Sequence, residues 1–199
     1  MPRLVAVAAL LLVVPAVASA QLSLTLRTGT VVHGAHAEAP SEEDSPGFGP
    51  ASATEFAGAV AWHGAGWRVA ATASTHSPDL QLRGETAGVL VVKALRGRAF
   101  GLEVGRDLVG REAGPRLTGL VGIANDRWQV IELGTTFSRW RGIAALEGGI
   151  PLRGRVSAVV RAEAGIAASL FEINDLPAGY DRTTAWRRAL QVGLRYGGR

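Results

Sequence analysis

Alternation of apolar and polar residues is the feature that most constrains this chain. Between residues 156 and 170 the even positions are apolar and the odd positions are mostly polar. The apolar series is Val156, Ala158, Val160, Ala162, Ala164, Ile166, Ala168 and Leu170. A helix would spread these side chains around its axis, whereas a strand places them on one face. The segment is therefore predicted to be one long β-strand.

The same alternation recurs along almost the whole chain after residue 20, as in the series Leu22, Leu24 and Leu26. It predicts an all-β fold with ten strands in a single domain, residues 21–199. The strands are expected at 21–33, 54–62, 67–75, 82–94, 99–107, 116–124, 128–138, 142–150, 155–170 and 183–196. After residue 20 the sequence has no run of 18 apolar residues, so it offers no membrane-spanning helix.

The first 20 residues have the pattern of a cleaved signal peptide. A short start with one charge, Arg3, precedes an apolar run from Leu4 to Val17, and Ala18-Ser19-Ala20 supplies the small residues of a cleavage site. A transmembrane anchor would be longer and would usually end in charged residues, but here the polar stretch begins at once with Gln21. We expect the mature protein to begin at Gln21.

The predicted connections alternate between short and long. The short ones are 63–66, 95–98, 125–127 and 151–154, and their counterparts are 34–53, 76–81, 108–115 and 171–182, with a further short connection at 139–141. Short turns on one side and long loops on the other are typical of an up-and-down antiparallel transmembrane β-barrel. An even number of strands returns both termini to the short-turn side, the periplasm. Eight strands is the alternative, if 99–107 or 142–150 is misread.

Alternation alone does not say which face meets the lumen, because a soluble secreted barrel that binds a ligand would carry its apolar residues inside. Aromatic residues near strand ends favour the membrane barrel, in which they form girdles at both lipid boundaries. The predicted girdle on the short-turn side is Trp62, Trp67, Phe100, Trp128 and Tyr196. The predicted girdle on the long-loop side is Phe56, Phe137, Trp140, Phe171 and Trp186.

Charged residues within the strands lie mostly on the parity opposite to the apolar residues. Inside a narrow barrel they are expected to pair into an ionic network that fills the lumen, because an unpaired buried charge is costly. The predicted network is Arg27, Glu55, Arg68, Arg83, Glu85, Glu103, Glu132, Glu147, Arg161, Glu163, Arg187 and Arg195. Arg106 and Arg188 lie on the apolar parity instead, and we expect both to reach the lipid boundary near the long loops.

The chain resembles the small bacterial outer-membrane β-barrel proteins of the OmpA/OmpX type. The resemblance covers residues 21–196 as a pattern of strands, and its most specific part is the last one, Leu190-Gln-Val-Gly-Leu-Arg-Tyr196. It is similar to the C-terminal signal that the barrel-assembly machinery reads in this family, although Gly197-Gly198-Arg199 follow the tyrosine here. The resemblance implies a porin-like barrel in the outer membrane, with membrane lipid and the assembly machinery as partners.

Some small outer-membrane barrels are enzymes that modify lipids, so residues able to form a catalytic triad are of interest. Ser74, His76 and Asp79 supply a nucleophile, a base and a carboxylate near the end of a predicted strand. Their spacing does not require them to meet, and ordinary polar loop residues explain them as well.

The candidate metal ligands are His33 and His36, which flank the start of the first long loop, and Glu42 and Asp44 within it, with Glu38 and Glu43 beside them. Carboxylates hold hard cations such as Ca²⁺, but no EF-hand spacing occurs and the prolines around them suit a solvated loop. No Gly-Lys pair or G-x-G-x-x-G motif is present, so no nucleotide cofactor is expected.

Composition excludes further classes. The chain has no Cys, which rules out disulfides, thiolate metal sites and a lipid anchor on cysteine. Its net charge is +4, and its basic residues are interspersed with acidic ones along the sequence. We therefore expect no nucleic-acid-binding face. We expect a non-enzymatic barrel with a largely filled lumen that is structural or binds a partner through its surface loops. A lipid-modifying enzyme, a narrow channel and a soluble ligand-binding barrel are the alternatives.

Overall fold

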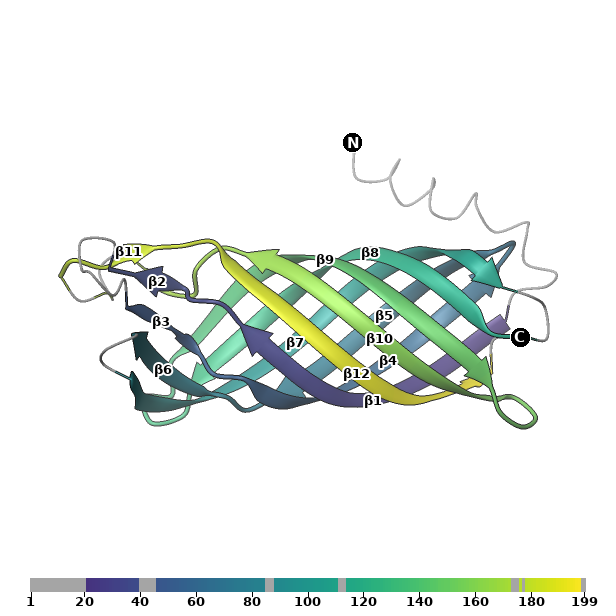
Figure 1. The fold of residues 1–199 in the computed structure, drawn as a ribbon, viewed down its shortest axis with the longest axis horizontal. Coiled ribbons are helices and arrows are strands. Elements are labelled where there is room, and N and C mark those ends of the chain that lie inside the picture. Colours follow the sequence, from purple (N-terminus) through teal and green to yellow (C-terminus); the bar gives the residue numbers. More distant parts are fainter. Residues whose placement is uncertain are drawn as a thin grey trace, which may run out of the picture.

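A computed structural model describes residues 21–39, 46–84, 88–110, 114–172, 176 and 178–197, and it shows an antiparallel β-barrel (Figure 1). The predicted signal peptide, 1–20, lies outside the described residues. Within the described part of the chain, no helix is long and apolar enough to cross a membrane.

Among the described residues, eight long strands close the barrel, and each pairs antiparallel with its neighbours. They are β1 (Gln21–His33), β4 (Ala53–Gly64), β5 (Trp67–His76), β7 (Gly88–Gly110), β8 (Arg116–Val130), β9 (Thr136–Pro151), β10 (Val156–Ala167) and β12 (Ala185–Gly197). The pairing of β1 with β12 closes the wall, so no long barrel strand is left with a free edge.

The prediction of ten strands was therefore wrong and the alternative of eight is confirmed. The reason is not the one expected, a misreading of 99–107 or 142–150. Segments 99–107 and 142–150 are strands, within β7 and β9. The error lay in the predicted turns 95–98 and 125–127, which lie inside β7 and β8. Gly97 suggested a turn, yet the His76 ring lies where a side chain at residue 97 would be.

With eight strands, some connections lie at the opposite end of the barrel from the one predicted. One end of the barrel carries the turns at 65–66, 111–115 and 152–155, so segment 108–115, expected among the long loops, is on the short-turn side. The other end, called here the long-loop end, carries 34–52, 77–87, 131–135 and 168–184. The predicted connection 139–141 is part of β9. At the tightest turn, Ala65 and Gly66 have φ of 50° and 76°, as a two-residue hairpin requires.

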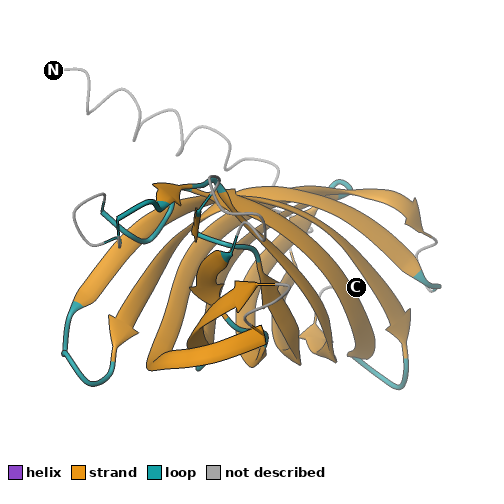
Figure 2. Cartoon of the chain, turned by 60° about the vertical axis from the view of Figure 1, so that its left-hand side comes forward, coloured by secondary structure: helices purple, strands orange, loops and turns teal. Residues whose placement is uncertain are grey.

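A second group of strands extends the wall beyond the barrel at the long-loop end. The first part of β7, up to Ala94, pairs with β6 (Asp79–Gly84). Next to β6 lie β3 (Gly47–Pro50), β2 (Ala37–Glu38) and β11 (Asp181–Arg182), in that order. We call β7, β6, β3, β2 and β11 the outer sheet; it comes forward in Figure 2.

The two faces of the barrel wall have opposite character. On β12, Leu190, Val192 and Leu194 are 60%, 54% and 56% exposed, so they point outward and not inward as a soluble barrel requires. The other barrel strands likewise expose large apolar side chains, among them Leu26, Val60, Val69, Leu102, Val121, Leu146 and Val160. The inward positions instead carry buried charged side chains such as Arg161 and Glu147. The barrel is therefore apolar outside and ionic inside.

Candidate functional site

The lumen is organised around Arg161 on β10, which is fully buried. Its guanidinium donates to both carboxylate oxygens of Glu103 on β7, at 2.9 and 2.7 Å, and to Glu163 at 2.8 Å. Arginine presents its N–H groups as a planar fork, so this two-point bond fixes the orientation of both side chains. The sequence places them there because residues 103 and 161 both lie on the inward parity.

Toward the short-turn end, one carboxylate receives three arginines. Glu147 on β9 accepts from Arg27 at 2.7 Å, from Arg68 at 2.6 Å, and from Arg195. Arg161 approaches the same carboxylate at 4.0 Å, which joins this group to the central pair. All these side chains are nearly inaccessible to solvent.

Toward the long-loop end, the network continues through Glu163. This carboxylate accepts from Arg141 at 2.7 Å and from Arg187. Arg141 also donates to Asp126 at 2.8 and 3.2 Å. Arg187 donates to Glu55 as well, and Gln191 donates to the other oxygen of Glu55 at 2.6 Å. The charges therefore form one continuous chain across the lumen.

Most of the predicted network residues meet in this chain: Arg27, Glu55, Arg68, Glu103, Glu147, Arg161, Glu163, Arg187 and Arg195. Three do not. Arg83 is exposed on β6 and bonds Gln81, Glu132 is exposed in a turn, and Glu85 lies outside the described residues.

The sequence reasoning missed Asp126, Arg141 and Gln191 as members of the network. Asp126 and Arg141 fall in the predicted connections 125–127 and 139–141, where a strand parity is not assigned, but both lie at inward positions of β8 and β9. Extending the alternation of 142–150 by one residue would have placed Arg141 inside. Gln191 carries no charge, so a network predicted from charged residues alone does not include it.

The space left around the network is small. The cavity lined by Glu55, Thr72 and Ser74 has a volume of about 20 Å³, and the one between His33 and Arg141 about 10 Å³. A cavity needs roughly 10–15 Å³ to hold a water molecule. These cavities therefore hold about one water each, and neither is a passage for solutes.

An apolar cluster, called here the cap, closes the lumen at the long-loop end. Its buried members are Ala37, Leu80, Leu95, Trp128, Val130, Leu170 and Phe171, and Phe48, Phe137, Leu176 and Tyr180 pack against them. They come from barrel strands, the outer sheet and the loop before β12. The cap thus ties segments far apart in the sequence to the barrel mouth.

Three histidines line the underside of the cap, around Trp128. The rings of His33 and His76 stack at 5.3 Å, and each meets the Trp128 ring edge-on, at 5.3 and 5.0 Å. His36, in the loop after β1, accepts a hydrogen bond at Nδ1 from the backbone N–H of Leu170 at 3.1 Å. Burial lowers the pKa of His36 to about 4, so its ring is neutral near pH 7.

The candidate triad is not assembled. Ser74 and His76 share the inward face of β5, but in the described residues no hydrogen bond joins them and neither ring nitrogen of His76 has a hydrogen-bond partner. The carboxylate beside His76 is Glu55, at 3.8 Å from Nδ1. Asp79 is exposed on β6.

The candidate metal ligands form no site among the described residues. Glu42, Glu43 and Asp44 lie outside the described residues, while Glu38 is exposed on β2 and His33 and His36 are buried at the cap. Across the described ranges, no group of three or more His, Asp or Glu side chains is arranged to hold a metal ion.

The structure divides the predicted girdle residues into outward and buried ones. Phe56, Trp67, Phe100, Trp140, Trp186 and Tyr196 are exposed on the outer wall, and Trp62 is half-buried there. Trp128 and Phe171 are instead buried in the cap, and Phe137 packs against it.

Three placements relative to the barrel ends were wrong, each because of a misread turn. Trp128 was expected at the short-turn end, but β8 continues past residue 127 and carries it to the long-loop end. Phe100 pairs with Ala73, toward the same end. Arg106 pairs with Trp67 beside the turn at 65–66, so it lies at the short-turn end and not near the long loops.

No protein-family model and no curated protein matches this sequence. Among solved structures, the chain is similar to the outer membrane protein OprG from Pseudomonas aeruginosa, with 9% identity, a TM-score of 0.60, and coverage of 89% of this chain and 95% of that chain. It also matches Ail, the attachment invasion locus protein of Yersinia pestis, with 11% identity, a TM-score of 0.37, and coverage of 89% and 97%. The likeness to OprG concerns the fold: the chain has the fold of a small bacterial outer-membrane β-barrel protein.

Proposed function

We propose that the protein is an integral β-barrel of the bacterial outer membrane that forms no open pore and presents its outer sheet and long loops at the cell surface. The observation that carries this proposal is the inversion of the wall, which is apolar outside and ionic inside. In this account the barrel is an anchor, and the task is structural or is the binding of a surface partner.

The outward face supports insertion into lipid. Its mid-wall residues are Leu, Val, Ile and Ala, and the closed hydrogen-bonded wall leaves no long barrel strand with an unpaired edge. Closed barrels are one of the two structures that satisfy every backbone polar group within a bilayer. In water the same face would expose apolar side chains from every barrel strand, far beyond an ordinary surface patch.

The filled lumen supports a non-conducting barrel. An eight-stranded barrel is just wide enough for side chains to fill its interior. Here the network from Glu147 to Glu55 crosses the lumen, and the cap covers its long-loop end. A solute would have to separate several buried ion pairs, each of which is costly to break.

The outer sheet supports a role at the surface. It extends the wall beyond the barrel mouth, and the loop before β12 is held to barrel strand β9 through Arg139, which bonds Glu172 at 2.5 Å and the Ser169 carbonyl at 2.8 Å. Loops held by a rigid scaffold are where binding surfaces usually occur. Short turns of outer-membrane barrels lie in the periplasm, so the long-loop end would face outward. The signal peptide and the strand ending at Tyr196 would direct export and assembly.

Two measurements test the proposal. The mature protein should fractionate with the outer membrane and change its gel mobility on heating. Purified protein in a planar bilayer should show no steady single-channel conductance, while a general porin reconstituted in the same way conducts. Recovery in the soluble periplasmic fraction would overturn the membrane assignment, and steady conductance would overturn the closed lumen.

A further inference from the structure

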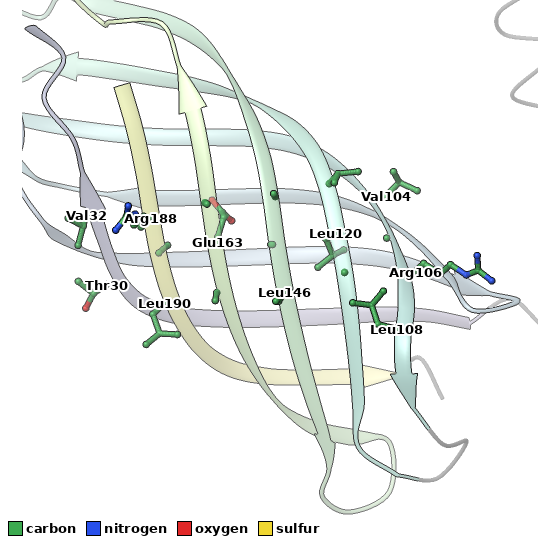
Figure 3. Close-up of a pocket in the computed structure, with 18 of the residues that line it drawn as sticks. Thr30, Val32, Val104, Arg106, Leu108, Leu120, Leu146, Glu163, Arg188 and Leu190 are labelled. Carbon is green, nitrogen blue, oxygen red and sulfur yellow. The ribbon is translucent and has the colours of Figure 1, made fainter. Parts of the chain in front are cut away.

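The outer wall carries a groove that runs obliquely between two rows of outward residues. Register pairing defines the rows, because residues bonded across neighbouring strands lie side by side. The first row is Thr30, Leu190, Ala162, Leu146, Gly119 and Arg106. The second is Val32, Arg188, Ala164, Ala144, Val121 and Val104. The groove has a volume of about 880 Å³ and is shown in Figure 3.

Small residues form the apolar floor of the middle of the groove. Ala162 and Ala164 on β10, Ala144 on β9 and Gly119 on β8 lie close together at outward positions, among larger outward residues such as Leu190, Leu146 and Val121. These residues leave room for an aliphatic chain to lie against the backbone of the wall. An apolar chain gains by contacts along such a surface even where its surroundings are also apolar, because close packing increases dispersion attraction.

Each end of the groove has an outward arginine on a tryptophan ring. The Arg188 guanidinium lies 4.8 Å from the Trp186 ring centre near the long-loop end, and that of Arg106 lies 5.6 Å from the Trp67 ring centre near the short-turn end. Neither arginine forms an ion pair with an acid among the described residues. Stacking on a ring face leaves the N–H groups of a guanidinium free to bind an anion.

The length of the groove fits one acyl chain. Four strand spacings separate Arg188 on β12 from Val104 on β7, which is about 19 Å at roughly 4.8 Å per spacing. One leaflet of a bilayer core is about 15 Å thick. A chain that begins at Arg188 and follows the oblique groove therefore ends within the membrane.

We propose that this groove binds a phosphate-bearing anionic lipid, whose phosphate pairs with Arg188 and one of whose acyl chains lies over Ala164, Ala144 and Ala162. The proposal rests on the membrane location given under Proposed function. The positive charge of Arg188 selects an anionic headgroup over a zwitterionic one, because a net negative headgroup leaves its phosphate charge uncompensated. The small residues select a lipid over a free anion, because only a lipid has a chain to place on them.

Native mass spectrometry of the whole barrel, released from detergent, tests the proposal with dipalmitoyl phosphatidylglycerol, phosphatidylcholine of the same chains, and inorganic phosphate as probes. Wild type should retain phosphatidylglycerol at least about tenfold more tightly than phosphatidylcholine, because the choline ammonium compensates the phosphate charge that Arg188 would otherwise pair with. R188Q should lose this preference. A164F should weaken both lipids because it fills the groove.

Matched controls are R127Q and A71F, which alter outward residues on β8 and β5 away from the groove. Both should bind phosphatidylglycerol within about twofold of wild type. Heat-dependent gel mobility confirms that every variant is folded. Equal retention of the two lipids, or unchanged binding in R188Q, would overturn the proposal, as would full displacement of the lipid by inorganic phosphate. Failure of the wild-type barrel to insert into phosphatidylcholine vesicles would instead overturn the membrane assignment itself.

Discussion

Arg161 and Glu103 face each other across the lumen from β10 and β7, and the guanidinium donates to both oxygens of the carboxylate, at 2.9 and 2.7 Å. The two residues are 58 positions apart in the sequence and both are buried. A buried charge whose partner is removed retains its desolvation cost without the compensating attraction. This pair therefore makes the lumen sensitive to any change that removes only one of the two charges.

The first prediction concerns this pair. E103L should lower the free energy of unfolding by about 3–5 kcal/mol, because the buried guanidinium of Arg161 loses its two-point partner and keeps only the bond to Glu163. The double variant E103L/R161M, which removes both charges, should be less destabilised than the single variant. Urea unfolding in detergent micelles measures both. A single variant as stable as wild type would mean that the pair is not buried as the structure shows.

A second prediction compares two tryptophans. Trp128 is buried in the cap, whereas Trp140 is 67% exposed on the outer wall. W128A should lower stability by about 3–5 kcal/mol because it leaves a cavity beneath the cap. W140A serves as the control and should cost about 1 kcal/mol or less. Thermal unfolding in micelles gives both values, and equal losses would contradict the cap.

The third prediction concerns pH and His36. Burial lowers its pKa from 6.5 to about 4, so between these values the unfolded chain binds a proton that the folded protein does not. Stability should fall as the pH drops from about 6.5 to 4, by about 3 kcal/mol in full. H36N keeps a hydrogen-bond acceptor near Nδ1 but does not titrate, and its stability should change less over this range. Parallel pH profiles for the two proteins would refute the assignment.

A fourth prediction tests which end of the barrel faces the outside. The natural chain has no Cys, so a single introduced cysteine reports its own location. Leu133 and Leu152 are both exposed, in the turn at 131–135 and in the turn after β9 respectively. A membrane-impermeant maleimide on intact cells should label L133C and not L152C, although both should react after lysis. Labelling of L152C alone would reverse the orientation.

Much of this fold follows from parity in the sequence. Alternation placed the inward charges such as Arg161 and the outward Leu190 on their correct faces, because a strand has a fixed period of two. It did not place the turns. Gly97 and the run Asn125-Asp126-Arg127 have local turn propensity, but contacts with neighbouring strands hold them in strands: the His76 ring lies against Gly97, and Arg141 bonds Asp126.

The cap shows where a single sequence contains little usable signal. Trp128, Phe171 and Leu80 are far apart in the chain and meet only because the outer sheet folds over the barrel mouth. Trp128 lies on the inward parity of β8, with Ala124 and Asp126, so parity is the one local signal that separates it from a girdle residue. The predicted turn at 125–127 placed Trp128 at the short-turn end, whereas β8 continues through this segment and carries it to the long-loop end.

The central claim is that the outer wall meets lipid while Trp128 does not. Two proteins test it, each with a single tryptophan in a background in which the other natural tryptophans are replaced by Phe: one keeps Trp128, and the other replaces all five natural tryptophans and carries V121W on the outer wall. Both are reconstituted into vesicles of phospholipid brominated on the acyl chains, which quenches tryptophan fluorescence on contact. The account predicts strong quenching of the V121W protein and little quenching of the protein that keeps Trp128. Quenching of Trp128, or an unquenched V121W protein, would contradict it.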